Sequence, residues 1–213
     1  MQQALSGMNS RLSSIGGSVV GAGDARTRAQ LDRSITRPRV GEVSLSAFAF
    51  LFSELVQYSQ KHVKGIQDLE KRLNLVGYRV GQRLLELLVF RDRGSKRDVK
   101  LLNALLFINT NVWKALFGKP ADSLEKSSEH DDEYMISDND LVVNRYISIP
   151  KEMAQLNTGA FVAGIVEAML DGSGFPARVT AHTVPVAGFP FRTTILIKFD
   201  AKVMEREKRL ADK

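Results

Sequence analysis

The sequence predicts one α+β domain, in which helices pack on an antiparallel sheet, behind a short basic leader. Two patterns lead to this fold class. After residue 40, three consecutive segments repeat apolar residues with the period of an α-helix, and from about residue 134 strand-like segments alternate with further helices. A chain of 213 residues with 44% hydrophobic and 25% charged residues can hold one ordinary globular domain and a tail.

Residues 1–40 are predicted to form a flexible basic leader. They are rich in Ser and Gly and have few large apolar side chains, so ordering them would bury little. Their positive charge outweighs Asp24 and Asp32. The arginines are Arg11, Arg26, Arg28, Arg33, Arg37 and Arg39. We expect a solvated leader, with contact to anionic lipid or RNA as the alternative, followed by a single domain over residues 41–213.

Three helices are expected in the first half of the domain. The first begins at a Ser44 or Ser46 cap and carries Leu51 on its apolar face. The second spans about Ile66–Arg91. The third, about Val99–Phe117, is apolar nearly all round and is therefore expected at the centre of the domain. Its apolar run is shorter than the roughly 18 residues that a membrane span requires.

The second half is expected to fold as two hairpins, each followed by a helix. The strands are Tyr134–Ile136, Val142–Ile149, Arg178–Thr183 and Thr193–Phe199, and the helices are Asn157–Leu170 and Ala201–Lys213. A turn at Asp138-Asn139-Asp140 would join the first two strands. The helix at 157–170 is dense in Ala and Gly, which allows close packing.

No pattern in the sequence predicts a catalytic, cofactor-binding or metal-binding residue. The chain has no cysteine, and His62, His130 and His182 share no ligand spacing. Residues 172–177 match the dinucleotide pattern G-x-G-x-x-A, but a helix precedes them and a strand follows, which is the reverse of the required order. The strands carry no aromatic ladder of the kind that binds nucleic acid. We therefore expect neither an enzyme nor a nucleic-acid-binding protein.

The helix at 66–91 has more apolar faces than packing on one core requires. At about 100° per residue, a second line of side chains lies away from its main stripe. The members of this line are Leu75, Tyr78, Gln82, Leu85 and Val89. Phe50 on the preceding helix lies nearly opposite the main apolar face, beside Val43. Large apolar side chains in register are typical of protein interfaces, so these seven residues are predicted to contact a partner. The alternative is that both faces lie inside the domain; Gly77 and Gly81 would let another backbone approach closely.

The connector between the last two strands is also unusual. Residues 184–191 form a link that is longer than a tight hairpin turn and nearly all apolar. A second contact surface is predicted at Val186, Phe189 and Phe191. It either docks on a partner or membrane or folds back on its own sheet.

Five segments, taken together, resemble the small-subunit family of the TRAPP (transport protein particle) complex. Val76–Glu86 resembles the signature of that family's second helix, and Gly159–Leu170 is similar to its packed helix before the second hairpin. Glu42–Phe48, Val112–Lys119 and Tyr146–Glu152 resemble the subunit-five branch. The match runs in order over about residues 38–199. The leader precedes it, and the connector at 184–191 resembles no segment of the family.

The resemblance implies a fold, a set of partners and a location. The fold is an α/β-plait, a four-stranded antiparallel sheet covered on one face by helices. The partners are other TRAPP small subunits, paired through the first two helices, and a Rab GTPase whose nucleotide exchange the assembled complex supports. The implied role is that of a non-catalytic scaffold in vesicle tethering during endoplasmic-reticulum-to-Golgi and Golgi transport. The implied location is cytoplasmic and peripheral on those membranes and on transport vesicles.

One departure from the family and one alternative function bear on these expectations. The best-known branch of the family carries an acylated cysteine in the loop after the second helix, which corresponds to about residues 94–98. This chain has no cysteine, so any peripheral membrane contact is expected through charge or partners. The alternative is a small apolar-ligand-binding domain of the 4-vinyl-reductase-like type, whose interior Gly77, Gly81 and Gly164 would line.

Overall fold

A computed structural model describes residues 43–91 and 98–211 of the chain. The basic leader predicted at residues 1–40 lies outside the described residues, as do the last two residues of the helix predicted at 201–213.

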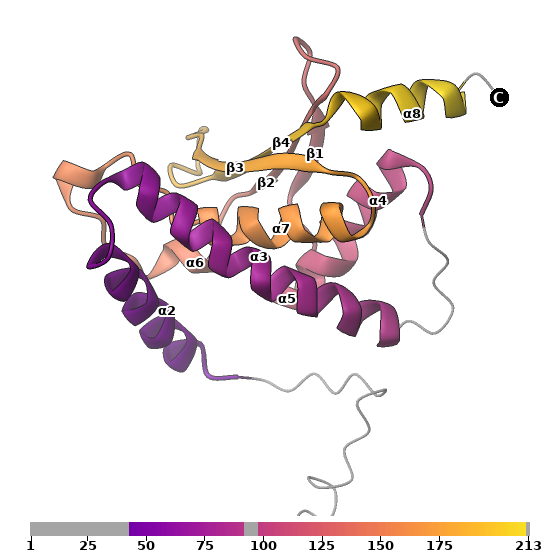
Figure 1. Ribbon diagram of the computed structural model, residues 1–213. Coiled ribbons are helices and arrows are strands. Elements are labelled where there is room, and N and C mark those ends of the chain that lie inside the picture. Colours follow the sequence, from indigo (N-terminus) through magenta and orange to yellow (C-terminus); the bar gives the residue numbers. More distant parts are fainter. Residues whose placement is uncertain (1–42, 92–97, 212–213) are drawn as a thin grey trace, which may run out of the picture. The chain divides into compact units, whose positions relative to one another are not determined.

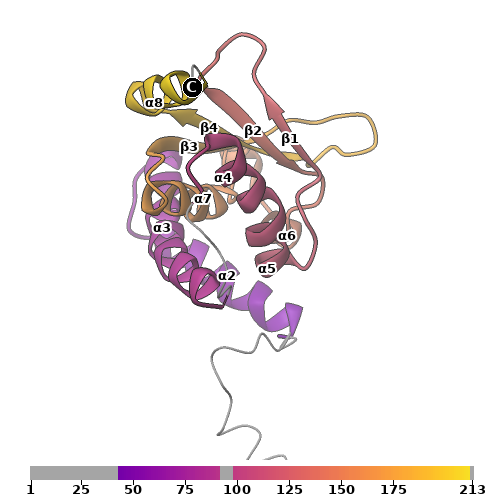
Figure 2. The same cartoon turned by 90° about the vertical axis from the view of Figure 1, so that its right-hand side faces the viewer.

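The sheet has four antiparallel strands, β1 (Ser123–Lys126), β2 (Glu133–Asp138), β3 (Ala177–Thr183) and β4 (Thr193–Phe199). Their order across the sheet is β1-β2-β4-β3, and β4 pairs with β2 on one side and β3 on the other. Ile136 of β2 lies opposite Ile195 of β4, and both are buried under the helices. Figures 1 and 2 show α3 and α7 on one face of the sheet. The predicted α+β class, with its four-stranded antiparallel sheet, is confirmed.

The helices follow the predicted order with several changes of boundary. They are α2 (Leu45–Gln60), α3 (Ile66–Arg91), α4 (Leu101–Phe107), α5 (Trp113–Phe117), α6 (Val142–Arg145), α7 (Ala160–Gly172) and α8 (Ala201–Ala211). A π-helical turn at Ile108–Val112 joins α4 to α5, and a 3₁₀ turn lies at Lys151–Met153. The Ser44 hydroxyl caps α2, accepting a hydrogen bond from the Ala47 amide at 3.4 Å.

The central helix of the domain is α7. It lies between the sheet and α3, and most of its side chains are buried on both sides. The prediction that the helix near residues 99–117 is central was therefore wrong. That segment packs with Leu105 and Trp113 inward, but Leu102 and Leu106 are exposed. Small side chains along α7 allow neighbouring elements to pack on two of its sides. The leucines of α4 are bulkier and point to all sides, but only one face of α4 is covered.

The hairpin predicted at 134–149 was also wrong in its second strand. The true partner of β2 in the hairpin is β1, which is too short and polar to show period-two alternation. Residues 142–145 instead form the helical turn α6. The Asn144 side chain donates to Thr193 Oγ1 at 2.8 Å, which links α6 to the first residue of β4.

Candidate partner interface

Helix α3 crosses α7 at a distance that only glycine permits. A Cβ on Gly77 would lie 1.9 Å from the carbonyl oxygen of Phe161, and one on Gly81 would lie 2.6 Å from that of Ile165. From the other side, a Cβ on Gly164 would lie 2.0 Å from the Asn74 carbonyl oxygen. The backbone that Gly77 and Gly81 admit is therefore that of α7 in the same chain. These three glycines line a helix–helix contact and not a ligand cavity.

Two side-chain hydrogen bonds fix the rotation of α3 about its own axis. Asn74 Nδ2 donates to Glu167 Oε2 at 3.1 Å, and the Tyr78 hydroxyl donates to Asp171 Oδ2 at 2.5 Å. The hydrogen bond to Asp171 raises the pKa of the Tyr78 phenol, with burial contributing in the same direction. Both bonds lie along one flank of the glycine contact and hold that flank of α3 against α7.

The predicted line on α3 includes this flank, since Tyr78 belongs to it, and we call its five residues the α3 ridge: Leu75, Tyr78, Gln82, Leu85 and Val89. Leu75 and Val89 are 52% and 50% exposed, and Gln82 is exposed as well. Tyr78 and Leu85 are half-buried at the edge nearest α7, and Leu85 Cδ2 lies 2.6 Å from where a Cβ of Gly172 would be. The sequence left open that both faces of this helix are buried inside the domain. Leu75 and Val89 are not buried there.

Helix α2 exposes apolar residues on its own outer face. Val43, just before the helix, is 80% exposed and Phe50 is 75% exposed, as predicted. Leu51 was assigned to the core in error, since it is 72% exposed and the buried side of α2 is formed by Phe52 and Val56. Figure 1 shows α2 leading away from the start of α3.

The β3–β4 connector folds into a small turn of its own. The backbone N–H of Val186 donates to the carbonyl oxygen of Phe189 at 3.2 Å, and the N–H of Phe189 donates to the carbonyl oxygen of Val186 at 2.9 Å. Gly188, between them, has a φ of 87°. The three side chains predicted here, Val186, Phe189 and Phe191, are all exposed, and Phe191 is so at 77%.

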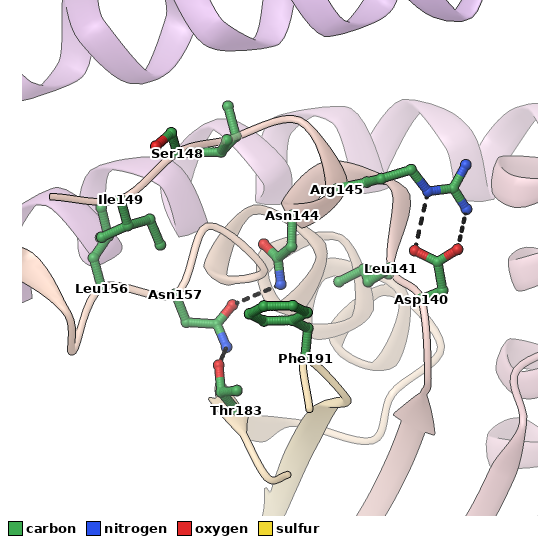
Figure 3. A pocket seen from close by; sticks show the side chains of 11 residues that line it. Asp140, Leu141, Asn144, Arg145, Ser148, Ile149, Leu156, Asn157, Thr183 and Phe191 are labelled. Atoms are coloured by element: carbon green, nitrogen blue, oxygen red, sulfur yellow. Dashed lines mark hydrogen bonds and ion pairs between the residues drawn. The ribbon is translucent and has the colours of Figure 1, made fainter. Parts of the chain in front are cut away.

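Beside Phe191 lies a cavity of about 440 Å³ that no sequence pattern indicated (Figure 3). Leu141, Ile149 and Leu156 supply apolar wall. Its lining comes from Thr183 at the end of β3, from Phe191 in the β3–β4 connector, and from residues within 140–149 and 156–157. The spacing of these segments in the sequence carries no shared period. Only the fold brings them together.

The polar side chains of this cavity bond mainly to one another. Asn144 Nδ2 donates to Thr193 Oγ1 and, at 3.3 Å, to Asn157 Oδ1. Asn157 Nδ2 donates in turn to Thr183 Oγ1 at 3.0 Å. At the rim, Arg145 Nε donates to Asp140 Oδ1 at 3.0 Å, and this ion pair raises the pKa of the guanidinium. The amide groups therefore hold the cavity's shape.

Across residues 43–91 and 98–211, no helix is both long and apolar enough to cross a membrane. Within the same ranges, no three His, Asp or Glu side chains are grouped as a metal ion would require.

Comparison with known proteins places the chain in a family. The family model described as transport protein particle (TRAPP) component matches residues 48–200. Trafficking protein particle complex subunit 5 of Dictyostelium discoideum is 58% identical over 177 residues, which cover 83% of this chain and 95% of that protein. Subunit 5 of Homo sapiens is 49% identical over 182 residues, 85% of this chain and 93% of that protein.

A solved structure shows the same fold at low sequence identity. The crystal structure of a trafficking protein particle complex subunit 3 from Naegleria fowleri, covalently bound to palmitic acid, matches with a TM-score of 0.64 and 17% identity, over 73% of this chain and 95% of that one. With the family model over most of the domain and relatives this similar over most of their length, the chain belongs to the TRAPP component family and resembles its subunit 5 members.

Proposed function

We propose that this chain is a non-catalytic structural subunit of a trafficking protein particle complex, in which it binds another small subunit through the α3 ridge and the exposed face of α2. The relatives that support the first half of this proposal are named as subunits of such a complex, and they align over nearly their whole length. The second half is supported by the surface described above.

The observation that carries the interface is the exposure of large apolar side chains on a helix whose orientation is fixed. A large apolar side chain left in water forgoes about 1.5–3 kcal/mol of burial. Leu75 and Val89 are held outward by the glycine contact and by the Tyr78–Asp171 bond, so they cannot turn into the domain's own core. A partner that covers them recovers this burial.

A substitution of Leu75 tests the interface. Leu75→Asp places a charge on the ridge without touching the core, and we expect binding of the neighbouring subunit to weaken at least about thirtyfold, as for loss of a central interface side chain. The full-length tagged chain would be purified from cells that express the whole complex, and the co-purified subunits quantified by mass spectrometry.

Leu102→Asp is the matched control for this experiment. Leu102 on α4 is 54% exposed, nearly the same as Leu75, but α4 is not one of the two helices, α2 and α3, that are assigned to the interface. We expect the Leu102 variant to retain every subunit. Equal recovery of the same subunits by both variants would contradict the assignment of the interface to α3.

We extend the proposal to the finer role that the family resemblance implies. The assembled complex would act in endoplasmic-reticulum-to-Golgi and Golgi transport and would promote nucleotide exchange on a Rab GTPase, with this chain cytoplasmic and peripheral to those membranes. Release of a fluorescent GDP analogue from the GTPase measures the exchange. We expect exchange from the assembled complex and none from the purified chain; exchange by the chain alone would contradict its non-catalytic role.

A further inference from the structure

We propose that Arg79 and Arg83 on α3 select an acidic partner, so that the subunit covering the α3 ridge places carboxylates of its own beside these two guanidinium groups. We call Arg79 and Arg83 the arginine pair. The inference rests on the proposed function, since it concerns the same interface, and it adds the charge of the surface that the interface accepts. It also excludes a second copy of this chain as the occupant.

The arginine pair lies along one side of the α3 ridge. Arg79 follows Leu75 by one helical turn, and Arg83 follows by one turn more. At about 100° per residue, both point to the side of the ridge away from Tyr78, whose hydroxyl is held on the α7 side by its bond to Asp171. Both arginines are exposed. A partner that covers Leu75 therefore meets the arginine pair at the edge of its contact.

Within the described residues, no carboxylate neutralises the arginine pair. On the same helix Lys71 pairs with Asp68 at 3.9 Å, whereas neither Arg79 nor Arg83 forms an ion pair, although Glu86 lies one turn from Arg83. A guanidinium matches a carboxylate through two parallel hydrogen bonds, and this contact is among the strongest polar ones. Two such groups along an apolar line are arranged to receive carboxylates from the chain that covers the line.

The positive charge continues from the arginine pair to the turn between α2 and α3. The Arg72 guanidinium lies over the ring of Tyr58 at 5.6 Å from its centroid, which links the two helices. Two exposed lysines, Lys61 and Lys64, occupy the turn itself. Against these cations, α3 exposes only two acidic side chains, those of Asp68 and Glu86. The whole border of the ridge on this side is therefore positive.

A second copy of this chain would meet the border with the same sign of charge. In a two-fold symmetric dimer the same patch of both copies faces itself, so the two arginine pairs would enter one interface. Like charges brought together in an interface cost several kcal/mol and reject the wrong partner. The occupant is therefore a different chain, with an apolar face bordered by Asp or Glu.

An anionic membrane is the other acidic surface to which arginines bind, and this face fits it less well. Asp68 and Glu86 lie on the same side of α3 as the arginine pair, and a uniformly negative bilayer would repel both. A protein partner can place cations opposite these two acids and carboxylates opposite the arginines. The mixed pattern therefore favours a protein.

Charge reversal tests the inference in the assembled complex. The double variant Arg79→Glu/Arg83→Glu would be co-expressed as the full-length tagged chain with the other subunits, and the subunit content measured by native mass spectrometry. We expect retention of one subunit to weaken about a hundredfold. The matched control is Arg178→Glu/Lys202→Glu, which changes the net charge equally at two exposed positions outside α2 and α3, and which should retain every subunit.

A conservative variant identifies the acidic residue of the partner. Arg83→Lys keeps the charge and supplies an amine that a zero-length carbodiimide reagent can join to a carboxylate in contact with it. We expect a crosslink to an Asp or Glu of another subunit. Changing that acid to Lys should restore binding of the Arg79→Glu/Arg83→Glu chain at least about tenfold. Crosslinks only to carboxylates of this chain, in the same or a second copy, or a failure to restore binding, would overturn the proposal.

The Leu75→Asp variant separates this inference from the proposed function. If Leu75→Asp loses a subunit and the charge-reversed chain keeps it, the ridge is the interface but its partner is not selected by charge. If both variants keep every subunit, the proposed interface fails as well. Flotation with phosphatidylserine vesicles tests the membrane: a charge-reversed chain that keeps all subunits and loses vesicle binding would assign the arginine pair to lipid and reject the proposal.

Discussion

Substitution of Gly77 by alanine is the sharpest test of the packing that orients α3. The new Cβ would lie 1.9 Å from the Phe161 carbonyl oxygen, and ordinary contact begins near 3.4 Å, so α3 must move outward by about 1.5 Å. Because the obstructing atom is backbone, no rotamer change relieves it. Overpacking of this kind costs about 3 kcal/mol, and displacement of α3 also weakens the Asn74–Glu167 and Tyr78–Asp171 bonds at about 1 kcal/mol each.

Alanine also offsets part of this cost. It favours the helix over glycine by about 1 kcal/mol, so the net loss in the free energy of unfolding should be about 2–4 kcal/mol. For a domain of this size that is a fall in Tm on the order of 10 °C. Urea unfolding followed by the fluorescence of Trp113, the single and fully buried tryptophan, measures it directly.

Gly65→Ala is the matched control, since a Cβ there meets nothing within 4 Å. Its free energy of unfolding should stay within about 0.5 kcal/mol of wild type. If Gly77→Ala unfolds at the same urea concentration as Gly65→Ala, the close α3–α7 contact does not exist as described, and the outward orientation of the ridge loses its support.

Two further predictions concern the hydrogen bonds of this domain. The hydrogen bond to Asp171 raises the pKa of Tyr78 above its ordinary value of 10.0, so the stability it contributes is fully present below pH 10 and is lost as pH rises through the folded pKa. Tyr78→Phe should therefore lose less stability than wild type as pH rises above 10 in unfolding titrations, and identical pH curves would refute the Tyr78–Asp171 bond. Asp138→Ala should lower the free energy of unfolding by about 3 kcal/mol. The buried Asp138 carboxylate accepts a hydrogen bond from Trp113 Nε1 at 2.9 Å and pairs with Lys119 Nζ at 3.1 Å, and the substitution removes both interactions. A change below about 1 kcal/mol in urea unfolding would refute that account.

Elements with a strong local signal could be predicted from the sequence. The bounds of α3 and β4 are those that periodicity indicates, and Ser44, which caps α2, is one of the two serines that residue preference allowed. The α3 ridge belongs with these, because helical geometry places every seventh residue on one side whatever the neighbours are. Which of its residues are exposed then depends on which face of α3 packs against α7.

Elements that depend on partners far along the chain could not be predicted. The strand signal near Ile147 and Ile149 is present in the sequence, but these residues form no strand, while polar β1 becomes a strand because β2 lies alongside. Gly77 and Gly164 show the same limit. Either could have lined a cavity or a backbone crossing, and only the position of α7 decides between them.

Helix α3 carries large apolar side chains on two sides. Leu69 and Leu73 are buried with Gly77 and Gly81 on the face toward the core, while Leu75 and Val89 face out. Leu73, Leu84 and Leu88 pack against the domain's own core, whereas Leu75 and Val89 are half exposed and contribute less to it. A sequence that served only the isolated fold would place polar residues at those outer positions, since exposed leucine and valine add a risk of aggregation and no gain in folding. Their presence is explained when the outer face of α3 is an inner face of an assembly.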